Sequence, residues 1–439
     1  MTRGGIGEVA PSAGLAPRAR DLFATFDGPT LEQAICRELG LPDIEILGSG
    51  TAAIVIALTY LRRQSRRSKV VIPAYTCPLV VSAVAAAGLK SVPCDTVAGG
   101  FGLDPDHLAR LIDADTLAVL PTHYGGALTD VERVRAIATA IAPDVKIVED
   151  AAQAFGATWQ GRSVGLVGDI GLFSFGAGKG FTLYAGGGLV AREPTIMAGL
   201  RTVAAELTSN SRLGEARRAL SLIGYHAFYN PLGLRAVYGA RKRFWLLRGD
   251  EIRAADDGVP RTVAVHRVGA WRKAVGRAAL RRLPAHLANS RERFARLAER
   301  LAAEPALRVH LPVAGAQPSA TCLFVTLPLS PTGAALIRRL WASRLGVTRM
   351  FSRAVVDYPA LQALVQATET PHARALAATT LTLSTAASFT PGAEAAVLSA
   401  LRDLSRMDDR VYRRSSSPRA AGNPAGESSR SLERQSGRR

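Results

Sequence analysis

The feature that most constrains the fold is an alternation of short β-branched runs with longer amphipathic segments between residues 29 and 179. This pattern is typical of an α/β domain in which helices join parallel strands. Helical segments are expected directly after Gly50 and after Thr129. Strands, which are close enough in sequence to form one mostly parallel sheet, are expected at 69–74, 91–95, 117–123, 146–150, 169–175 and 187–192.

Beyond Pro194 the sequence changes character. Arg-rich helical sequence with interleaved Tyr, Phe and Trp runs to residue 260, and a long helical pattern that is interrupted at Pro284 begins at Arg261. A strand-like segment, ATCLFVTLPL, and two later helical segments predict a smaller C-terminal α+β domain. We expect a partly flexible N-terminal arm (1–28), a large domain (29–260) with an insertion at about 195–260, a linking helix and small domain (261–412), and a disordered Arg- and Ser-rich tail (413–439).

The chain has 439 residues and a formal net charge of +19, which is unevenly distributed. Residues 201–300 hold 21 Lys and Arg against 8 Asp and Glu, and residues 413–439 hold 7 against 2, so the remainder is nearly neutral. A solvated basic helical face is the simplest interpretation, and we predict no nucleic-acid partner. The alternative is that residues 215–250 touch anionic lipid or receive a pyrophosphate-bearing substrate.

Targeting and cysteine signals are weak. The first twenty residues lack the apolar core of a secretory signal, and no uncharged apolar run reaches about 18 residues. The four cysteines lie far apart, without a CxxC pair or a Cys/His cluster. We therefore expect no membrane span, no disulfide framework and no structural zinc site. The expected location is the cytoplasm, with a peripheral position at the inner membrane as the alternative.

A glycine-rich turn, Gly48-Ser49-Gly50-Thr51, directly precedes an apolar helix. Such a turn directs backbone N–H groups and a hydroxyl toward the positive end of the helix dipole, where a phosphate can bind. The simpler alternative is an ordinary helix N-cap. A dinucleotide-binding fold is disfavoured, because the next strand ends on Pro73 and Ala74 without the carboxylate that the fingerprint requires.

Asp150 ends the predicted strand KIVED, and the carboxyl end of a parallel strand is a common place for site residues. Its carboxylate could hold a ligand cation, coordinate a metal or cap the next helix. Glu149 beside it is expected to face the other side of the sheet. We predict no metal, since no second carboxylate or histidine lies at ligand spacing.

Lys179 is a single lysine among small residues in FSFGAGKGF, just past an apolar strand. A semi-buried lysine loses its proton readily and can form a Schiff base with an aldehyde, whereas the alternative is an exposed turn lysine. Ser174, five residues earlier, could donate to a phosphate. Together, a phosphate turn, an anion and a lysine are what pyridoxal 5′-phosphate needs for its phosphate, its pyridine nitrogen and its aldehyde.

The chain also resembles a known family. The segments GSGTAA, VIPAYTCP, PTHYGG, VEDAAQAFGA, GDIGLFSFGAGKGFT and GGGLVAR are similar to successive motifs of the DegT/StrS family of pyridoxal phosphate-dependent sugar aminotransferases. The resemblance implies fold type I, with a mostly parallel sheet flanked by helices and a smaller C-terminal domain. It also implies that Lys179 is the Schiff-base lysine, that Asp150 pairs with the pyridine nitrogen, that Gln153 lies near the ring, and that Gly50, Thr51 and Ser174 hold the phosphate.

Three positions depart from that family's pattern. Cys77 occupies the position of an aromatic residue that stacks on the cofactor, and Ala185 replaces a glutamate. The Asn-x-Arg motif by which a partner subunit reaches the phosphate is reduced to Val259-Pro260-Arg261. We therefore expect weaker stacking and a changed contribution from the partner.

The resemblance implies a homodimeric aminotransferase that moves an amino group from an amino acid, glutamate by analogy, to a nucleotide-linked keto-sugar. The expected setting is the synthesis of cell-surface polysaccharides or secondary metabolites. Two alternatives remain: an enzyme with a lipid-linked or non-sugar acceptor at the membrane surface, and a catalytically silent homologue with a binding role.

Overall fold

The structure, a computed structural model, describes residues 7–260 and 262–416, with side chains up to residue 404. A seven-stranded sheet in the order β1-β9-β8-β5-β4-β2-β3 forms the centre of the larger domain. The neighbours β3, β2, β4, β5 and β8 are parallel, while β9 is antiparallel to both β8 and β1. The strands are β1 (Glu45–Leu47), β2 (Lys69–Pro73), β3 (Lys90–Cys94), β4 (Thr116–Val119), β5 (Lys146–Asp150), β8 (Ile170–Ser174) and β9 (Gly187–Ala191).

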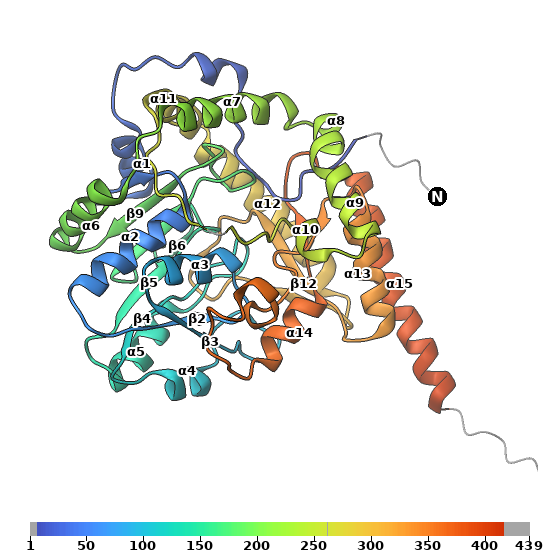
Figure 1. Cartoon of the computed structure of the whole chain (residues 1–439). Coiled ribbons are helices and arrows are strands. Elements are labelled where there is room, and N and C mark those ends of the chain that lie inside the picture. Colours follow the sequence, from blue (N-terminus) through green and yellow to red (C-terminus); the bar gives the residue numbers. More distant parts are fainter. Residues whose placement is uncertain (1–6, 261, 417–439) are drawn as a thin grey trace, which may run out of the picture.

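Helices cover both faces of this sheet (Figure 1). The strands are apolar on both sides, so each face contributes alternate residues to a different core, as expected of parallel strands. One face packs against α2 (Gly50–Arg63), α3 (Pro78–Ala86) and α6 (Pro194–Leu207). The other packs against α1 (Leu31–Leu39), α4 (Pro105–Leu111), α5 (Val131–Ile141) and α11 (Ala270–Leu280).

The smaller domain is an antiparallel sheet in the order β10-β12-β14-β13, covered by helices. A short three-stranded sheet, β11-β6-β7, ties it to the larger domain. The strands are β6 (Thr158–Trp159), β7 (Arg162–Ser163), β10 (Arg308–His310), β11 (Ala316–Gln317), β12 (Cys322–Thr326), β13 (Val347–Thr348) and β14 (Thr380–Ser384). The helices are α12 (Leu283–Ala302), α13 (Pro331–Ala342), α14 (Pro371–Thr379) and α15 (Pro391–Ser416).

The expected insertion is helical. Helix α7 (Arg212–Phe228) crosses the top of the molecule in Figure 1, and the chain then descends beside α13. The descending elements are α8 (Pro231–Leu234), the π-helical turn η2 (Arg235–Gly239), α9 (Ala240–Leu247) and α10 (Glu251–Ala255). No helix within the described residues is long and apolar enough to cross a membrane.

All six expected strands are present, as are the helices after Gly50 and Thr129. The long helical pattern expected from Arg261 is wrong in its first part: Arg261 lies outside the described residues, and the helix begins at Ala270. The interruption predicted at Pro284 is confirmed to within a few residues. Helix α11 ends at Leu280 and α12 begins at Leu283, so Pro284 lies in the first turn of α12, where its missing N–H costs nothing. Among the strands that the sequence interpretation missed are β1, which has three residues, and β14, which directly follows helix α14.

Two terminal predictions fall partly outside the described residues. From residue 7 onward the arm packs against the rest of the chain, since the Ala13 amide donates to the Thr321 carbonyl at 2.8 Å. A 3₁₀ turn, η1 (Ala19–Phe23), follows, and Asp21 within it pairs with Arg282. Helix α15 runs four residues into the expected tail, and residues 417–439 lie outside the described chain.

Candidate active site

The candidate site lies where parallel strands β2, β4, β5 and β8 end. Asp150 closes β5 and is bridged to Thr122, just past β4. Ser174 closes β8, and Cys77 follows β2 at the N-terminus of α3. Because these strands run in the same direction, residues distant in sequence meet at one edge of the sheet.

Asp150 is 3% exposed, and its Oδ1 accepts from the Ala152 amide at 2.9 Å. Burial raises the pKa of Asp150, while the Ala152 amide and the Lys179 amine act in the opposite direction. Glu149, as expected, faces the other side. It accepts from His123 at 2.8 Å and from the backbone of Gly165 at 2.6 Å, so it fixes a loop rather than serving the site.

Lys179 lies on the loop after β8, between glycines, and Gly178 has a φ of +76°. Burial lowers the pKa of Lys179, and the carboxylate charge of Asp150 acts to raise it. The amine of Lys179 and the carboxylate of Asp150 are therefore close enough for each charge to act on the other. The lysine is not the fully exposed turn residue of the simpler interpretation, since its side chain is partly buried.

Two thiols, from different domains, are close enough to this lysine for its charge to act on them. Burial raises the pKa of Cys77 to about 11 and that of Cys322 to about 12, and in both cases the Lys179 charge acts to lower it. Both thiols are therefore protonated near neutral pH and form small, uncharged walls. Cys322 lies on β12 of the smaller domain, so no local sequence signal pointed to it.

The glycine-rich turn begins α2. The Ser49 hydroxyl accepts from the Ala52 amide at 3.0 Å, so the N-cap interpretation of this residue is correct. A Cβ on Gly50 would lie 3.1 Å from the Ser174 Cβ, which places Gly50 and Thr51 beside Ser174. Strand β9 presses against the same turn, because a Cβ on Gly187 would lie 2.4 Å from the Ser49 carbonyl. The result is a narrow cradle at a helix N-terminus.

Gln153 follows Asp150 by three residues and reaches toward the smaller domain. Its side-chain Nε2 donates to the Met350 sulfur at 3.4 Å, and its main-chain carbonyl accepts from the Ser319 hydroxyl at 2.9 Å. Gln153 therefore links the Asp150 loop to the segment around Met350.

The sequence interpretation missed His266. Its ring lies over Gly48, since a Cβ there would be 2.3 Å from Nε2. The residue is 9% exposed, and within the described chain neither ring nitrogen has a hydrogen-bond partner. Burial, followed by the charge of Arg218, lowers its pKa, so the imidazole is neutral. A lone histidine in a loop carries no sequence signal for such a position.

Asp257 was also missed. Its carboxylate accepts from the Tyr358 hydroxyl at 2.6 Å and from the Ser352 amide at 2.8 Å. Burial raises its pKa, and its charge in turn acts on Cys77. Asp257 comes from the insertion, so the inserted segment contributes to the surroundings of the site.

Ala185 occupies the position where the resemblance leads us to expect a glutamate, and its main-chain carbonyl is bound by a residue of α11. The fully buried Arg272 donates to the Ala185 carbonyl and to the Leu183 carbonyl at 3.2 Å. Glu215, on α7, pairs with the same guanidinium at 2.6 Å. Of the Val259-Pro260-Arg261 motif, Arg261 lies outside the described residues.

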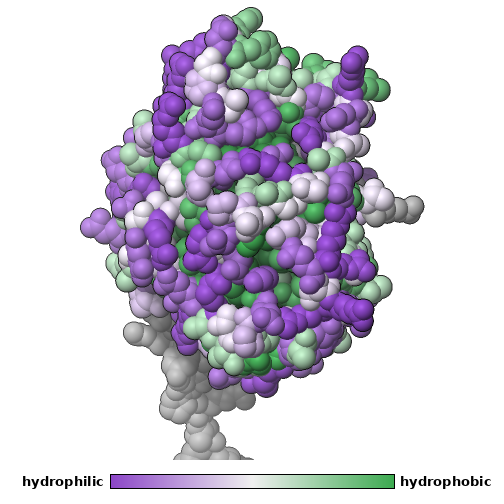
Figure 2. Space-filling view, turned by 90° about the vertical axis from the view of Figure 1, so that its left-hand side faces the viewer, coloured by the Kyte–Doolittle hydropathy of each residue, from purple (hydrophilic) through white to green (hydrophobic). Residues whose placement is uncertain are grey.

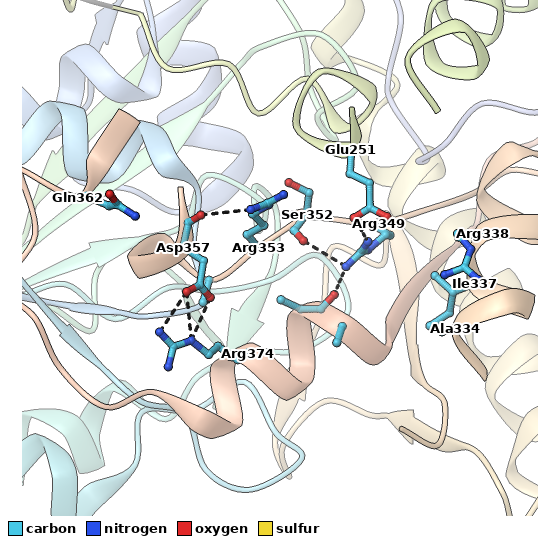
Figure 3. Close-up of a pocket in the computed structure, with 13 residues that line it drawn as sticks. Glu251, Ala334, Ile337, Arg338, Arg349, Ser352, Arg353, Asp357, Gln362 and Arg374 are labelled. Atoms are coloured by element: carbon cyan, nitrogen blue, oxygen red, sulfur yellow. Dashed lines mark hydrogen bonds and ion pairs between the residues drawn. The ribbon is translucent and has the colours of Figure 1, made fainter. Parts of the chain in front are cut away.

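A cation-rich pocket of about 530 Å³ borders the segment that follows Met350 (Figure 3). In it Arg349 donates to Glu251 at 2.8 Å, and Arg374 pairs with Asp357 at 3.0 Å. Arg338 makes no ion pair with any described residue. The pocket therefore retains positive charge that can attract a carboxylate or phosphate.

These residues fit pyridoxal phosphate on three counts. The cradle at Gly50 suits a phosphate, the buried Asp150 carboxylate suits a protonated ring nitrogen, and the Lys179 amine suits an aldehyde. The uncharged thiol of Cys77 leaves one wall of the site without an aromatic ring.

Comparisons with known proteins agree with this geometry. Solved structures share the fold. DesI with its TDP-sugar product gives a TM-score of 0.69 at 19% identity, covering 94% of this chain and 96% of that one. PseC of Helicobacter pylori, an aminotransferase of pseudaminic acid biosynthesis, gives 0.69 at 15% identity, covering 91% and 100%. The fold is therefore that of the pyridoxal phosphate-dependent transferases of type I, as expected.

The sequence matches the DegT/DnrJ/EryC1/StrS aminotransferase family over residues 28–226 and 266–402. The chain belongs to this family, whose members use pyridoxal phosphate. The interval that the match leaves out, residues 227–265, overlaps the expected insertion at 227–260, whereas residues 195–226 of that insertion lie inside the match.

Among curated relatives, 3-amino-5-hydroxybenzoate synthase of Amycolatopsis mediterranei (strain S699) is 33% identical over 142 residues, which are 32% of this chain and 36% of that protein. Protein MosB of Rhizobium meliloti is 33% identical over 157 residues, which are 35% and 30%. The chain thus matches about a third of the length of these relatives.

Proposed function

We propose that this protein is a pyridoxal phosphate-dependent aminotransferase that moves an amino group from an amino acid to a keto-sugar. The observation that carries the proposal is the partly buried Lys179 amine close to the buried Asp150 carboxylate, at the strand edge where a phosphate cradle also lies. Family membership supports the same reaction class.

Each residue has a distinct role in the proposal. When bound, the cofactor supplies an aldehyde for the amino group and a ring that accepts electrons. Lys179 binds covalently and moves a proton at its Nζ, which its lowered pKa favours. Asp150 keeps a proton on the ring nitrogen, and Gln153 contacts the ring. Gly50, Thr51 and Ser174 hold the phosphate.

Glutamate is the proposed donor and a nucleotide-linked keto-sugar the proposed acceptor, within polysaccharide or secondary-metabolite biosynthesis. The cation-rich pocket beside Met350 supports a dicarboxylic donor. A neighbour whose solved structure includes a TDP-sugar product supports the acceptor class.

A second candidate is a lipid-linked acceptor, with residues 215–250 at the membrane surface. The observation favouring it is apolar exposure beside basic residues: Leu220 is 69% exposed and Leu247 is 89% exposed. Flotation with anionic vesicles tests the surface contact. The wild type should float and Leu247→Glu should float less, whereas equal partitioning of the two would remove this candidate.

Donor half-reaction measurements test the main proposal. Holoenzyme mixed with glutamate should change its visible absorption and release one 2-oxoglutarate per site, and keto-sugar nucleotides should then restore the original spectrum. Lys179→Ala should do neither. If the wild type binds the cofactor but releases no oxo acid from any amino acid, the catalytically silent interpretation is correct instead.

A further inference from the structure

A second cavity, of about 540 Å³, lies between the insertion and the loop that carries Lys179. Helix α7 lines it with Ser221 and Gly224, α10 lines it with Ala254, and Ala177 and Gly178 form part of its wall. Five aromatic side chains also line it: Tyr184, Tyr225, Phe228, Tyr229 and Tyr238.

This cavity is coupled directly to the lysine loop. The Gly178 amide donates to the Tyr225 hydroxyl at 3.3 Å. A Cβ on Gly14 would lie 3.0 Å from the Tyr229 hydroxyl and 3.3 Å from the Lys179 carbonyl. A molecule in the cavity would therefore contact the segment that positions the proposed catalytic amine.

The cations that line the cavity already have partners. Arg241 pairs with Asp256 at 2.5 Å, and the buried Lys242 pairs with Glu8 at 3.1 Å. Arg253 stacks on the ring of Trp245, 4.5 Å from its centroid. An anionic occupant would have to break these pairs, whereas a hydrocarbon would bury its surface against rings and aliphatic carbon.

The mouth of the cavity continues the apolar lining outward. Phe228 is 53% exposed and Val237 is 57% exposed, and Leu232 nearby is 62% exposed. Most of this wall falls in residues 227–265, which the family match leaves out. The cavity is therefore built largely from residues outside the family match, and its apolar lining continues to exposed side chains at its mouth.

We propose that this cavity binds the hydrocarbon chain of a lipid-linked acceptor, of the isoprenoid phosphate class. The proposal rests on the proposed aminotransferase function, and it takes the second candidate acceptor, the lipid-linked one, in place of the nucleotide-linked keto-sugar. Placing the chain between α7 and α10 holds the attached keto-sugar on the side of the Lys179 loop.

Gly224 allows a selective test. Within the described chain no atom lies within 4 Å of a Cβ built there, so a larger side chain can enter the cavity without a clash, and replacing glycine favours the helix. Gly224→Phe fills the cavity, Gly224→Ala leaves most of it open, and Ala216→Phe adds the same ring to α7 outside the lining.

Calorimetry on the holoenzyme with farnesyl diphosphate as the probe measures the effect. Binding should be at least tenfold weaker in Gly224→Phe and unchanged in Gly224→Ala and Ala216→Phe, with equal thermal stability as the folding control. Inorganic diphosphate should bind far more weakly than the farnesyl ester. Equal farnesyl diphosphate affinity in Gly224→Phe and wild type would overturn the proposal.

Binding of uridine diphosphate distinguishes a nucleotide carrier of the keto-sugar from an isoprenoid carrier. If uridine diphosphate binds more tightly than farnesyl diphosphate and displaces it, the carrier is a nucleotide and the proposal is wrong. Failure of the underlying function would look different: farnesyl diphosphate would still bind in a Gly224-sensitive way, while glutamate would leave the cofactor spectrum unchanged.

Discussion

At the scale of single residues, the site depends on two charges that act on each other in a desolvated place. Burial pushes the pKa of Asp150 up and that of Lys179 down, and each charge opposes the effect of burial on the other. The amine therefore loses its proton at a lower pH than an exposed lysine does.

Removing the carboxylate charge tests this coupling. Because Asp150 raises the pKa of Lys179, Asp150→Asn should lower that pKa further. In the apoenzyme, the pH midpoint for modification of Lys179 by an amine-specific reagent, followed by peptide mapping, should move to lower pH. Asp144→Asn, a change at an exposed position, is the control. An unchanged or higher midpoint would show that Asp150 does not act on this amine.

A residue of the candidate site could be predicted from the sequence only where its immediate neighbours in the chain indicate its position. Asp150, Lys179 and the Gly50 turn were identifiable because each stands next to a recognisable strand or helix start. Cys322 and His266 could not be found in this way, since they reach the site through the packing of distant segments. Asp257 gave no signal because its partners, Tyr358 and Ser352, lie about a hundred residues away.

At the scale of elements, the cofactor cradle is built by close backbone approach between α2 and β9. A Cβ on Gly187 would lie 2.4 Å from the Ser49 carbonyl and 2.6 Å from the Gly50 nitrogen. Both contacts are to backbone atoms, so they cannot be relieved by moving a side chain. Only glycine at position 187 allows the strand to press on the turn.

Gly187→Ala should therefore displace the turn. We expect pyridoxal phosphate affinity to fall at least tenfold, and urea unfolding of the apoenzyme to show a loss of about 1–3 kcal/mol from overpacking. Gly102→Ala, where the described structure leaves open space around the new Cβ, should change neither quantity. Wild-type affinity and stability in Gly187→Ala would contradict this account of the cradle.

Strand and helix positions in the sheet domain could be predicted because β-branched runs and amphipathic segments alternate clearly. The error near Arg261 arose from composition: Arg- and Ala-rich sequence favours helix wherever it occurs, whereas residues before Ala270 pair instead with other segments. One such pairing bridges Arg267 to Leu47 on β1. That contact spans more than two hundred residues, so no local pattern reveals it.

At the scale of the whole molecule, one end exposes apolar side chains from two segments. These are the turn η1 with the residues just after it, and helix α7; both η1 and α7 pack on α11. Figure 2 shows polar residues over most of one face, with apolar residues gathered toward its upper edge. Phe23 is 84% exposed, Phe26 is 68% exposed and Leu213 is 76% exposed. Because both segments pack on α11, we treat these three side chains as one apolar patch, and such patches are typical of surfaces that another protein covers.

We propose that a second copy of the chain covers this patch, which gives the expected homodimer. Sedimentation velocity should show a dimer for the wild type, and Leu213→Glu should shift it toward monomer. Leu329→Glu, at an equally exposed leucine on the smaller domain, should leave the dimer intact. A wild type that stays monomeric at all concentrations would remove this prediction.

The central claim is that Lys179 binds the aldehyde of pyridoxal phosphate, and borohydride reduction tests it most directly. Wild-type protein supplied with cofactor should be yellow, and reduction followed by peptide mapping should find the cofactor attached to Lys179. Lys179→Ala should show neither the colour nor the label, although its phosphate cradle is intact. A colourless wild type, or a label on another lysine, would contradict the account.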